Sequence, residues 1–157
     1  MRAQLNGEEN DMMSVKQRSV GKLINTINRY SEMYINKQLK QFGIGASQMH
    51  FLMLLYQNDG VTQHELAQKL YVDKGTATRA IQKLEQLGYI SRKASKDDQR
   101  KNLVFVTEKA LAIRLDIINI LGDWTSVLTR DMSETEKSSL LRLLNQSAKN
   151  AIHYHDD

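Results

Sequence analysis

Cysteine and proline are both absent from this chain of 157 residues. Without cysteine, a disulfide framework, a thiolate metal site and sensing through cysteine oxidation are excluded. Without proline, nothing interrupts a long helix and no proline-rich linker separates independent domains. No apolar run approaches the roughly 20 residues of a transmembrane helix, so no membrane association is expected. Residues 1–11 lack the apolar core of a secretory signal, which predicts a cytoplasmic protein.

Acidic and basic residues nearly balance, and the small positive excess is unevenly placed. The chain has 22 lysines and arginines against 18 aspartates and glutamates. Residues 61–107 hold nine of the basic and five of the acidic residues, a net charge of +4, so the remainder is neutral. The share of apolar residues, 41%, is that of a folded protein with one domain or an integrated pair. A neutral scaffold with one basic module is the charge layout of a protein that binds duplex DNA.

The N-terminal third predicts a polar arm followed by two helices. Residues 1–14 show no apolar periodicity and are expected to form a flexible arm. Apolar residues recur every three or four positions over 15–42, which predicts one long helix, and the glycines that follow it end it. Ser47 is predicted to cap a second helix, which ends at the sequence Asn58-Asp59-Gly60.

Residues 61–107 predict a helix-turn-helix followed by a β-hairpin. The sequence from Thr62 to Glu65 has the capping-box pattern, in which the threonine and the glutamate satisfy free N–H groups of the first turn. Asp73 is predicted to cap the next helix, which has an apolar stripe and ends before Gly88. Segments 89–93 and 102–106 then predict two strands around a charged loop at 94–101.

Two further helices are predicted after the hairpin. The first, capped by Thr107 and extending over about 108–130, has two apolar rows and must therefore be covered on two sides. A second capping box at 133–136 begins the last helix, which reaches about residue 154. The expected fold class is all-α with a small β-wing: a winged helix-turn-helix domain at 47–107 flanked by long helices at 15–42 and 108–154.

The polar face of the helix that follows Asp73 has the side chains that entry into a major groove requires. Small or hydrogen-bonding residues at its N-terminal end let the helix approach the base edges, and no carboxylate there repels phosphate. Arg79 is the candidate for a guanine contact, and Thr76 and Thr78 for backbone or thymine-methyl contacts. Lys74 and Lys83 are expected to reach phosphates.

The backbone amides at the start of the preceding helix, at Thr62, Gln63 and His64, offer a further phosphate contact. A solvated polar helix surface is the competing interpretation of this face. The confinement of the charge excess to this region, followed directly by a charged hairpin, favours DNA binding. The predicted DNA-binding residues are Thr62, Gln63, His64, Lys74, Gly75, Thr76, Thr78, Arg79, Lys83, Arg92, Lys96, Asp98, Arg100 and Lys101.

Three motifs in this region occur together. Residues 98–107, DQRKNLVFVT, fit the wing signature D-x-R-x-x-x-V/L-x-L/V-T. Residues 84–92, LEQLGYISR, fit the junction L-E-x-x-G-h-I/V-x-R, where h is hydrophobic, and residues 72–79, VDKGTATR, resemble the start of a recognition helix. In combination these motifs resemble the MarR family of bacterial and archaeal transcriptional regulators, over roughly residues 15–154.

This resemblance implies a homodimer in which the first helix and the last two helices interlock. Two winged modules would then meet successive major grooves, about one helical turn or ~34 Å apart, on a pseudo-palindromic operator. It also implies that Asp98 orients Arg100, which enters the minor groove at the wing tip, where negative potential is concentrated. An arginine that only pairs with its neighbouring aspartate is the alternative. The expected function is sequence-specific regulation of transcription, as a repressor where the operator overlaps a promoter.

The resemblance also raises an effector, since many such regulators release DNA when a small phenolic or other aromatic anion binds between the dimer helices and the winged module. Aromatic and methionine walls with one or two cations suit such a ligand. Plain dimer core is the more common role of aromatic and methionine residues at this helical spacing, and a protein neighbour is the more common partner of such cations, so the ligand site is a hypothesis beside these interpretations. The candidate residues are Arg29, Tyr30, Met33, Tyr34, His50 and Trp124.

Two other classes of function compete with DNA binding. A winged-helix module that binds protein instead would expose apolar residues on its recognition face, where this chain has lysine, threonine and arginine. The sequence shows neither a glycine-rich phosphate loop nor a clustered catalytic pair, so an enzyme would need a site built wholly by folding, and no enzyme is expected. His153 and His155 lack a carboxylate or thiolate partner at ligand spacing, so neither a metal site nor a cofactor is expected.

Overall fold

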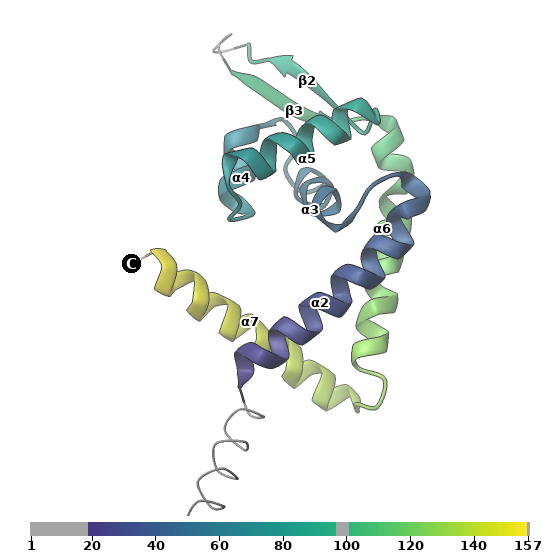
Figure 1. The fold of residues 1–157 in the computed structure, drawn as a ribbon, viewed down its shortest axis with the longest axis vertical. Coiled ribbons are helices and arrows are strands. Elements are labelled where there is room, and N and C mark those ends of the chain that lie inside the picture. The colour runs from purple at the N-terminus through teal and green to yellow at the C-terminus, as the bar shows by residue number, and fades with distance from the viewer. Residues whose placement is uncertain (1–18, 97–100, 157) are drawn as a thin grey trace, which may run out of the picture. The chain divides into compact units, whose positions relative to one another are not determined.

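The computed structural model describes residues 19–96 and 101–156. The chain divides into two units, Met1–Ile120 and Leu121–Asp157, and each is described by itself. The elements in chain order, drawn in Figure 1, are α2 (Val20–Leu39), the 3-10 helix η1 (Lys40–Phe42), α3 (Ala46–Leu55), β1 (Val61–Thr62), α4 (Gln63–Lys69), α5 (Lys74–Gln86), β2 (Ile90–Ala94), β3 (Asn102–Val106), α6 (Glu108–Leu128) and α7 (Glu134–Asp156). The expected class, all-α with a small β-wing, is confirmed.

The first long helix is observed from Val20, where the Ser19 hydroxyl oxygen accepts a hydrogen bond from the Lys22 amide at 3.3 Å. It continues to Leu39 and tightens into η1, and Gly43 in the left-handed conformation follows. The helix predicted over 15–42 is therefore confirmed from residue 20, while residues 15–18 and the predicted arm at 1–14 lie outside the described residues.

The prediction that Ser47 caps the second helix is wrong, because α3 begins at Ala46 and Gly45 is its N-cap. The Gln48 side chain accepts from the Gly45 amide at 3.0 Å, and the Asn36 side chain accepts from the Ala46 amide at 2.8 Å. Asn36 belongs to α2, so the acceptor that fixes the start of α3 comes from a neighbouring helix. Local spacing around Ser47 could not show this contact.

The helix-turn-helix forms as predicted, with N-caps at Thr62 and Asp73. Tyr71 lies in the turn between α4 and α5, with a φ of 53°. The apolar stripe of α5 is buried at Ala77, Ala80, Ile81 and Leu84. These side chains form one core with residues of α3, α4 and β3, including Leu52, Leu55, Leu66, Ala67 and Val104.

The sheet has three strands among the described residues, one more than the predicted hairpin. β2 and β3 are antiparallel, with Ile90 opposite Val106 and Ala94 opposite Asn102. β1 pairs with the other edge of β3, with Val61 opposite Val104, so the strand order is β1-β3-β2. A strand of two residues is too short to show an alternating pattern, which is why the sequence did not reveal it.

The helix α6 has its two predicted apolar rows, and they are covered to different extents. Ile117 and Ile120 are buried. Leu111, Leu115 and Ile118 on the other row remain exposed, Leu115 by 66%. Exposed aliphatic side chains at this spacing indicate a further surface that can be buried by a partner.

In the second unit, the predicted capping box begins α7. The Glu136 carboxylate accepts from the Ser133 amide at 2.7 Å, and the Ser133 hydroxyl oxygen accepts from the Glu136 amide at 3.3 Å. The helix exposes a series of apolar side chains, and none of its residues is buried. Among residues 19–96 and 101–156, no helix has both the length and the apolar composition that crossing a bilayer requires. The exposed apolar side chains of α7 are Leu141, Leu143, Leu144, Ile152 and Tyr154.

Candidate nucleic-acid interface

The N-terminus of α5 is fixed by the carboxylate of Asp73. One of its oxygens accepts from the Thr76 amide at 2.9 Å, and the other accepts from the Thr76 hydroxyl at 2.6 Å. These bonds, the hydroxyl first and the amide second, lower the pKa of the Asp73 carboxyl from its usual 3.8. The carboxylate is therefore ionised at neutral pH and remains the acceptor that caps the helix.

The exposed face of α5 has the polar side chains that the sequence predicted for DNA. Lys74, Gly75, Arg79 and Lys83 are exposed, and Thr76 and Thr78 are half-buried. The Arg79 guanidinium donates to the Thr76 hydroxyl oxygen at 3.1 Å. Arg79 is thus held at the N-terminal part of the helix, where a helix in the major groove meets the base edges.

Gln63 connects α4 to the same face. Its side-chain amide donates to the Thr78 hydroxyl oxygen at 2.8 Å, and that hydroxyl donates to the Lys74 carbonyl oxygen at 2.8 Å. Gln63 and Thr78, which the sequence predicted as separate contacts, therefore touch one another. The neighbouring His64 is exposed at the start of α4.

The capping box of α4 is complete. The Glu65 carboxylate accepts from the Thr62 amide and from the Thr62 hydroxyl, each at 2.7 Å. These two bonds lower the pKa of Glu65 from 4.5, and Lys69 and Lys101 contribute less. Because Thr62 lies opposite Leu103 of β3, the start of α4 lies close to Lys101 at the loop end of the wing, so two predicted groups of DNA-binding residues lie near one another.

The basic residues of the wing differ in whether they have a partner within the protein or are exposed to solvent. The Arg92 guanidinium pairs with the Glu85 carboxylate of α5 at 2.9 Å, so Arg92 has a protein partner. Lys96 and Lys101 are exposed near the ends of β2 and β3, where the Ser95 amide donates to the Lys101 carbonyl oxygen at 2.8 Å. The predicted pair Asp98 and Arg100 lies outside the described residues.

Three residues of this surface were missed as site residues by the sequence reasoning. Asp73 was predicted only as a cap, although the i, i+3 spacing to Thr76 is a local signal that could have linked it to the face. Glu85 has no such signal, since its partner Arg92 lies on another element. Lys93, whose ammonium lies 5.3 Å from the centroid of the Phe105 ring, adds a basic residue to the wing.

Five of the six predicted ligand residues lie in the first unit, on α2 and α3. Tyr30 and Met33 are exposed on α2, and Tyr34 is half-buried on the same helix. On α3, partial burial lowers the pKa of the His50 imidazole, against an opposing effect of Glu32. The one candidate outside the first unit, Trp124, is half-buried on α6 in the second unit.

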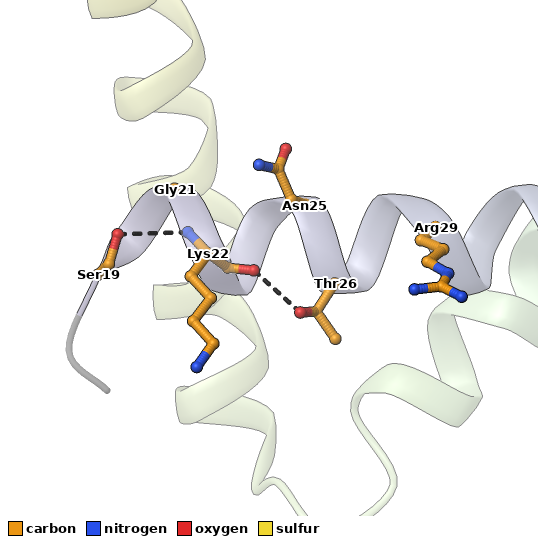
Figure 2. A pocket seen from close by; sticks show the side chains of 6 residues that line it. All are labelled: Ser19, Gly21, Lys22, Asn25, Thr26 and Arg29. Atoms are coloured by element: carbon orange, nitrogen blue, oxygen red, sulfur yellow. Dashed lines mark hydrogen bonds between the residues drawn. The ribbon is translucent and has the colours of Figure 1, made fainter. Parts of the chain in front are cut away.

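Arg29, the sixth candidate, lines a shallow hollow of about 580 Å³ along the N-terminal half of α2. Figure 2 shows Ser19 and Lys22 at its start, joined by the capping bond, and Thr26, whose hydroxyl donates to the Lys22 carbonyl oxygen at 2.9 Å. The hollow is polar and open, unlike an enclosed apolar site for an aromatic acid. Among residues 19–96 and 101–156, no group of three His, Asp or Glu side chains is placed to hold a metal ion.

Comparison with known proteins now adds to this geometry. The model of the MarR family matches residues 44–101, which include α3, the helix-turn-helix and β2, and end just before β3. A structure of a MarR transcriptional regulator from Methanosarcina mazei superposes with a TM-score of 0.82 at 36% identity, over 86% of this chain and 97% of that one. This chain belongs to the MarR family of DNA-binding transcriptional regulators.

Two further relatives support the MarR assignment. The uncharacterized HTH-type transcriptional regulator YybA of Bacillus subtilis is 30% identical over 128 residues, which are 81% of this chain and 85% of that protein. The HTH-type transcriptional regulator BilQ of Clostridioides difficile is 27% identical over 134 residues, 85% of this chain and 90% of that protein. The function of this MarR protein is therefore regulation of transcription by DNA binding rather than catalysis.

Proposed function

We propose that this MarR protein is a homodimeric, sequence-specific repressor that binds a pseudo-palindromic operator. The observation that supports this most directly is the exposed polar face of α5, where Arg79 is held over the N-terminal turn by the Thr76 hydroxyl. In this proposal, residues 47–107 contact DNA and helices over 15–42 and 108–154 form the dimer. A module that binds protein would need exposed apolar residues on this face, and Lys74, Arg79 and Lys83 occupy it instead.

Dimerisation is supported by apolar surface that the single chain leaves open. Six large apolar residues of α2 are between 42% and 63% exposed. Full burial of such a side chain from complete exposure is worth about 1.5–3 kcal/mol, so covering the exposed half of each gives roughly half of that, and the six together favour a second copy of the chain. These residues are Val20, Leu23, Ile24, Ile27, Tyr30 and Met33.

Each part of the basic module has a proposed role on DNA. Arg79 reads a guanine with two hydrogen bonds, while Lys74 and Lys83 neutralise phosphates on either side. Thr62, Gln63 and His64 at the start of α4 meet the phosphate backbone. The wing, with Lys96 and Lys101 at the loop ends of its two strands and Asp98 and Arg100 in the predicted loop between them, meets the minor groove. Gly75 and Thr78 lie on the same face of α5 as Arg79, and Arg92 lies on β2.

Release by a small aromatic anion is the regulatory part of the proposal. Arg29 and His50 supply candidate cations, and Tyr30, Met33, Tyr34 and Trp124 supply aromatic or thioether walls. A ligand shifts the spacing of the two modules only if it binds one spacing more tightly than the other. Thermal-shift screening of aromatic acids tests this part, with a shift in melting temperature and a loss of operator affinity expected for the same compound.

The central experiment is selection of bound sequences from a random duplex pool with the purified protein. A pseudo-palindromic consensus with half-sites about one helical turn apart is expected, together with a dimer in sedimentation analysis. Binding should weaken steeply as salt rises, because phosphate contacts release counterions. A monomeric protein, or one that enriches no sequence at low salt, contradicts the proposal.

Two substitutions test the assigned contacts on the selected operator. Arg79→Ala should weaken binding at one base pair by about 1–3 kcal/mol and relax sequence preference there. A loss that is uniform across sequences would instead reassign Arg79 to a phosphate. Arg100→Ala should reduce affinity mainly for operators with A·T-rich flanks, and an unchanged footprint at those flanks would argue against entry of the wing into the minor groove.

A further inference from the structure

Three side chains at the start of α5 form one continuous hydrogen-bonded chain. The Thr76 hydroxyl donates to the Asp73 carboxylate at 2.6 Å, and the Arg79 guanidinium donates to the Thr76 hydroxyl oxygen at 3.1 Å. A hydroxyl has one proton, and here Asp73 accepts it. Thr76 therefore presents a lone pair to Arg79, and the direction of the chain is fixed from guanidinium to hydroxyl to carboxylate.

Charge reinforces this direction. The Asp73 carboxyl has a lowered pKa, mainly through its bonds from Thr76, with a smaller contribution from the positive charge of Arg79. An ionised acceptor polarises the hydroxyl between the two groups and strengthens its bond to the arginine. The attraction between Asp73 and Arg79 is thus transmitted through Thr76 as well as through space.

The backbone leaves room for this arrangement at Gly75. A Cβ added there would lie 3.1 Å from an Asp73 carboxylate oxygen and 3.4 Å from an Arg79 guanidinium nitrogen. Both ends of the chain therefore flank the same residue and lie close to the helix surface. The arginine is held along the first turns of α5 and does not extend freely into solvent.

We propose that Thr76 is a positioning residue that, supported by Asp73, orients the Arg79 guanidinium for reading of one base pair. This inference depends on the proposed function and goes beyond it, because it makes Thr76 act on sequence preference through Arg79 and not through a DNA contact of its own. Only one of the five guanidinium N–H groups is used by Thr76, so the others remain available for the two acceptors of a guanine. A side chain that is already oriented loses less conformational freedom when it binds.

The test compares Thr76→Val with Thr76→Ser. Valine keeps the branched shape and the backbone N–H that donates to Asp73, so the helix cap survives, but the hydroxyl is lost. Serine restores the hydroxyl. The measured quantity is the discrimination ratio, the affinity for the selected operator divided by that for an operator changed at the base pair that Arg79→Ala identifies.

We expect Thr76→Val to lower this ratio about fivefold at that base pair alone, with a small fall in melting temperature from the lost hydroxyl bond to Asp73, and Thr76→Ser to retain the ratio of the unmodified protein. Lys83→Gln is the matched control on the same helix: it should weaken binding to all operators equally and leave the ratio intact. A uniform loss of affinity in Thr76→Val would overturn the inference.

A double-mutant cycle with Arg79→Ala decides through which group Thr76 acts. If Thr76 positions Arg79, Thr76→Val causes no further loss of discrimination once Arg79 is absent. An equal loss with and without Arg79 would show that Thr76 contacts DNA directly, which overturns this inference while leaving the proposed function standing. If the unmodified protein selects no sequence from the pool, both the inference and the proposed function are overturned.

Discussion

Gly60→Ala should destabilise the protein more than the same change at another left-handed glycine. Gly60 has a φ of 72°, and a Cβ added there would lie 2.8 Å from a carbon of the Phe105 ring. Gly43 also has a φ of 72°, but its added Cβ would meet only the Leu87 side chain at an ordinary 3.6 Å. The two positions therefore share the backbone cost and differ in the steric one.

The expected sizes follow from these two terms. A left-handed conformation costs an L-residue roughly 1–2 kcal/mol, so Gly43→Ala should lower the free energy of unfolding by about that amount. Overpacking against a ring adds about 1–3 kcal/mol, so Gly60→Ala should cost about 2–5 kcal/mol. Urea denaturation at one fixed protein concentration measures both, because the stability of a dimer depends on concentration.

A second substitution isolates the ring contact. Phe105→Leu removes the ring edge that the new methyl group would meet, so the double variant Gly60→Ala, Phe105→Leu should lose less stability than the sum of the two single changes. Equal destabilisation by Gly60→Ala and Gly43→Ala, or strict additivity with Phe105→Leu, would refute the steric reasoning. The Phe105 ring also contacts the Lys93 ammonium on the wing, so the same variants measure how much this ring contributes to the stability of the hairpin.

Four other outcomes follow from individual contacts. Thr62→Ala should cost about 1 kcal/mol in urea denaturation and Thr62→Ser much less, because serine keeps the cap. The pKa of Glu65 is lowered in the folded state, so the unmodified protein should have a higher free energy of unfolding than Glu65→Gln above pH 4.5. This difference should disappear as the pH falls below 4.5, and a difference that does not change with pH would exclude the carboxylate as its source. Burial raises the pKa of Tyr56 to about 12, and the Tyr56 hydroxyl donates to the Ala110 carbonyl oxygen at 2.6 Å. The free energy of unfolding that Tyr56 adds relative to Tyr56→Phe should therefore be intact below pH 10 and decline as the pH approaches 12. Glu85→Gln removes the partner of Arg92, so it should raise affinity for all duplexes and steepen the salt dependence, whereas unchanged binding would show that Arg92 stays away from DNA.

The parts of this fold that depend on local spacing could be predicted from the sequence. The capping boxes at Thr62 and Ser133 and the cap at Asp73 each join residues three positions apart, and all three are observed. The buried stripe of α5 also follows from helical spacing and is confirmed. These elements position the proposed DNA-reading face, which is why the face itself could be located from the sequence.

The parts that depend on contacts between elements could not be predicted in this way. The start of α3 is set by Asn36 on α2, and β1 exists only because β3 pairs with it. The ion pair of Arg92 with Glu85 likewise requires the strand to lie beside the recognition helix. For the same reason the predicted ligand residues stayed ambiguous, because helical spacing on α2 describes a dimer core and a ligand wall equally well.

The C-terminal end of α5 is joined by hydrogen bonds to neighbouring elements, which restricts the ways in which a bound ligand could move this helix. The Lys109 ammonium donates to the Leu87 carbonyl oxygen at 2.7 Å and lies 4.7 Å from the centroid of the Tyr89 ring, and the Thr107 hydroxyl donates to the Gly88 carbonyl oxygen at 2.7 Å. Tyr89 in turn donates from its hydroxyl to the Phe42 carbonyl oxygen at 2.9 Å.

The recognition helix is thus joined to the start of α6 and to the end of the first long helix by several hydrogen bonds, each worth about 0.5–1.5 kcal/mol. A ligand that rotated α5 against these helices would have to break the bonds together. Movement of the whole winged module, with α5 held against the start of α6, breaks none of these hydrogen bonds. An effector that changes the spacing of two modules therefore meets the smallest free-energy cost when it moves complete modules. The difference between its affinities for the two spacings must then come from contacts outside the helix-turn-helix core.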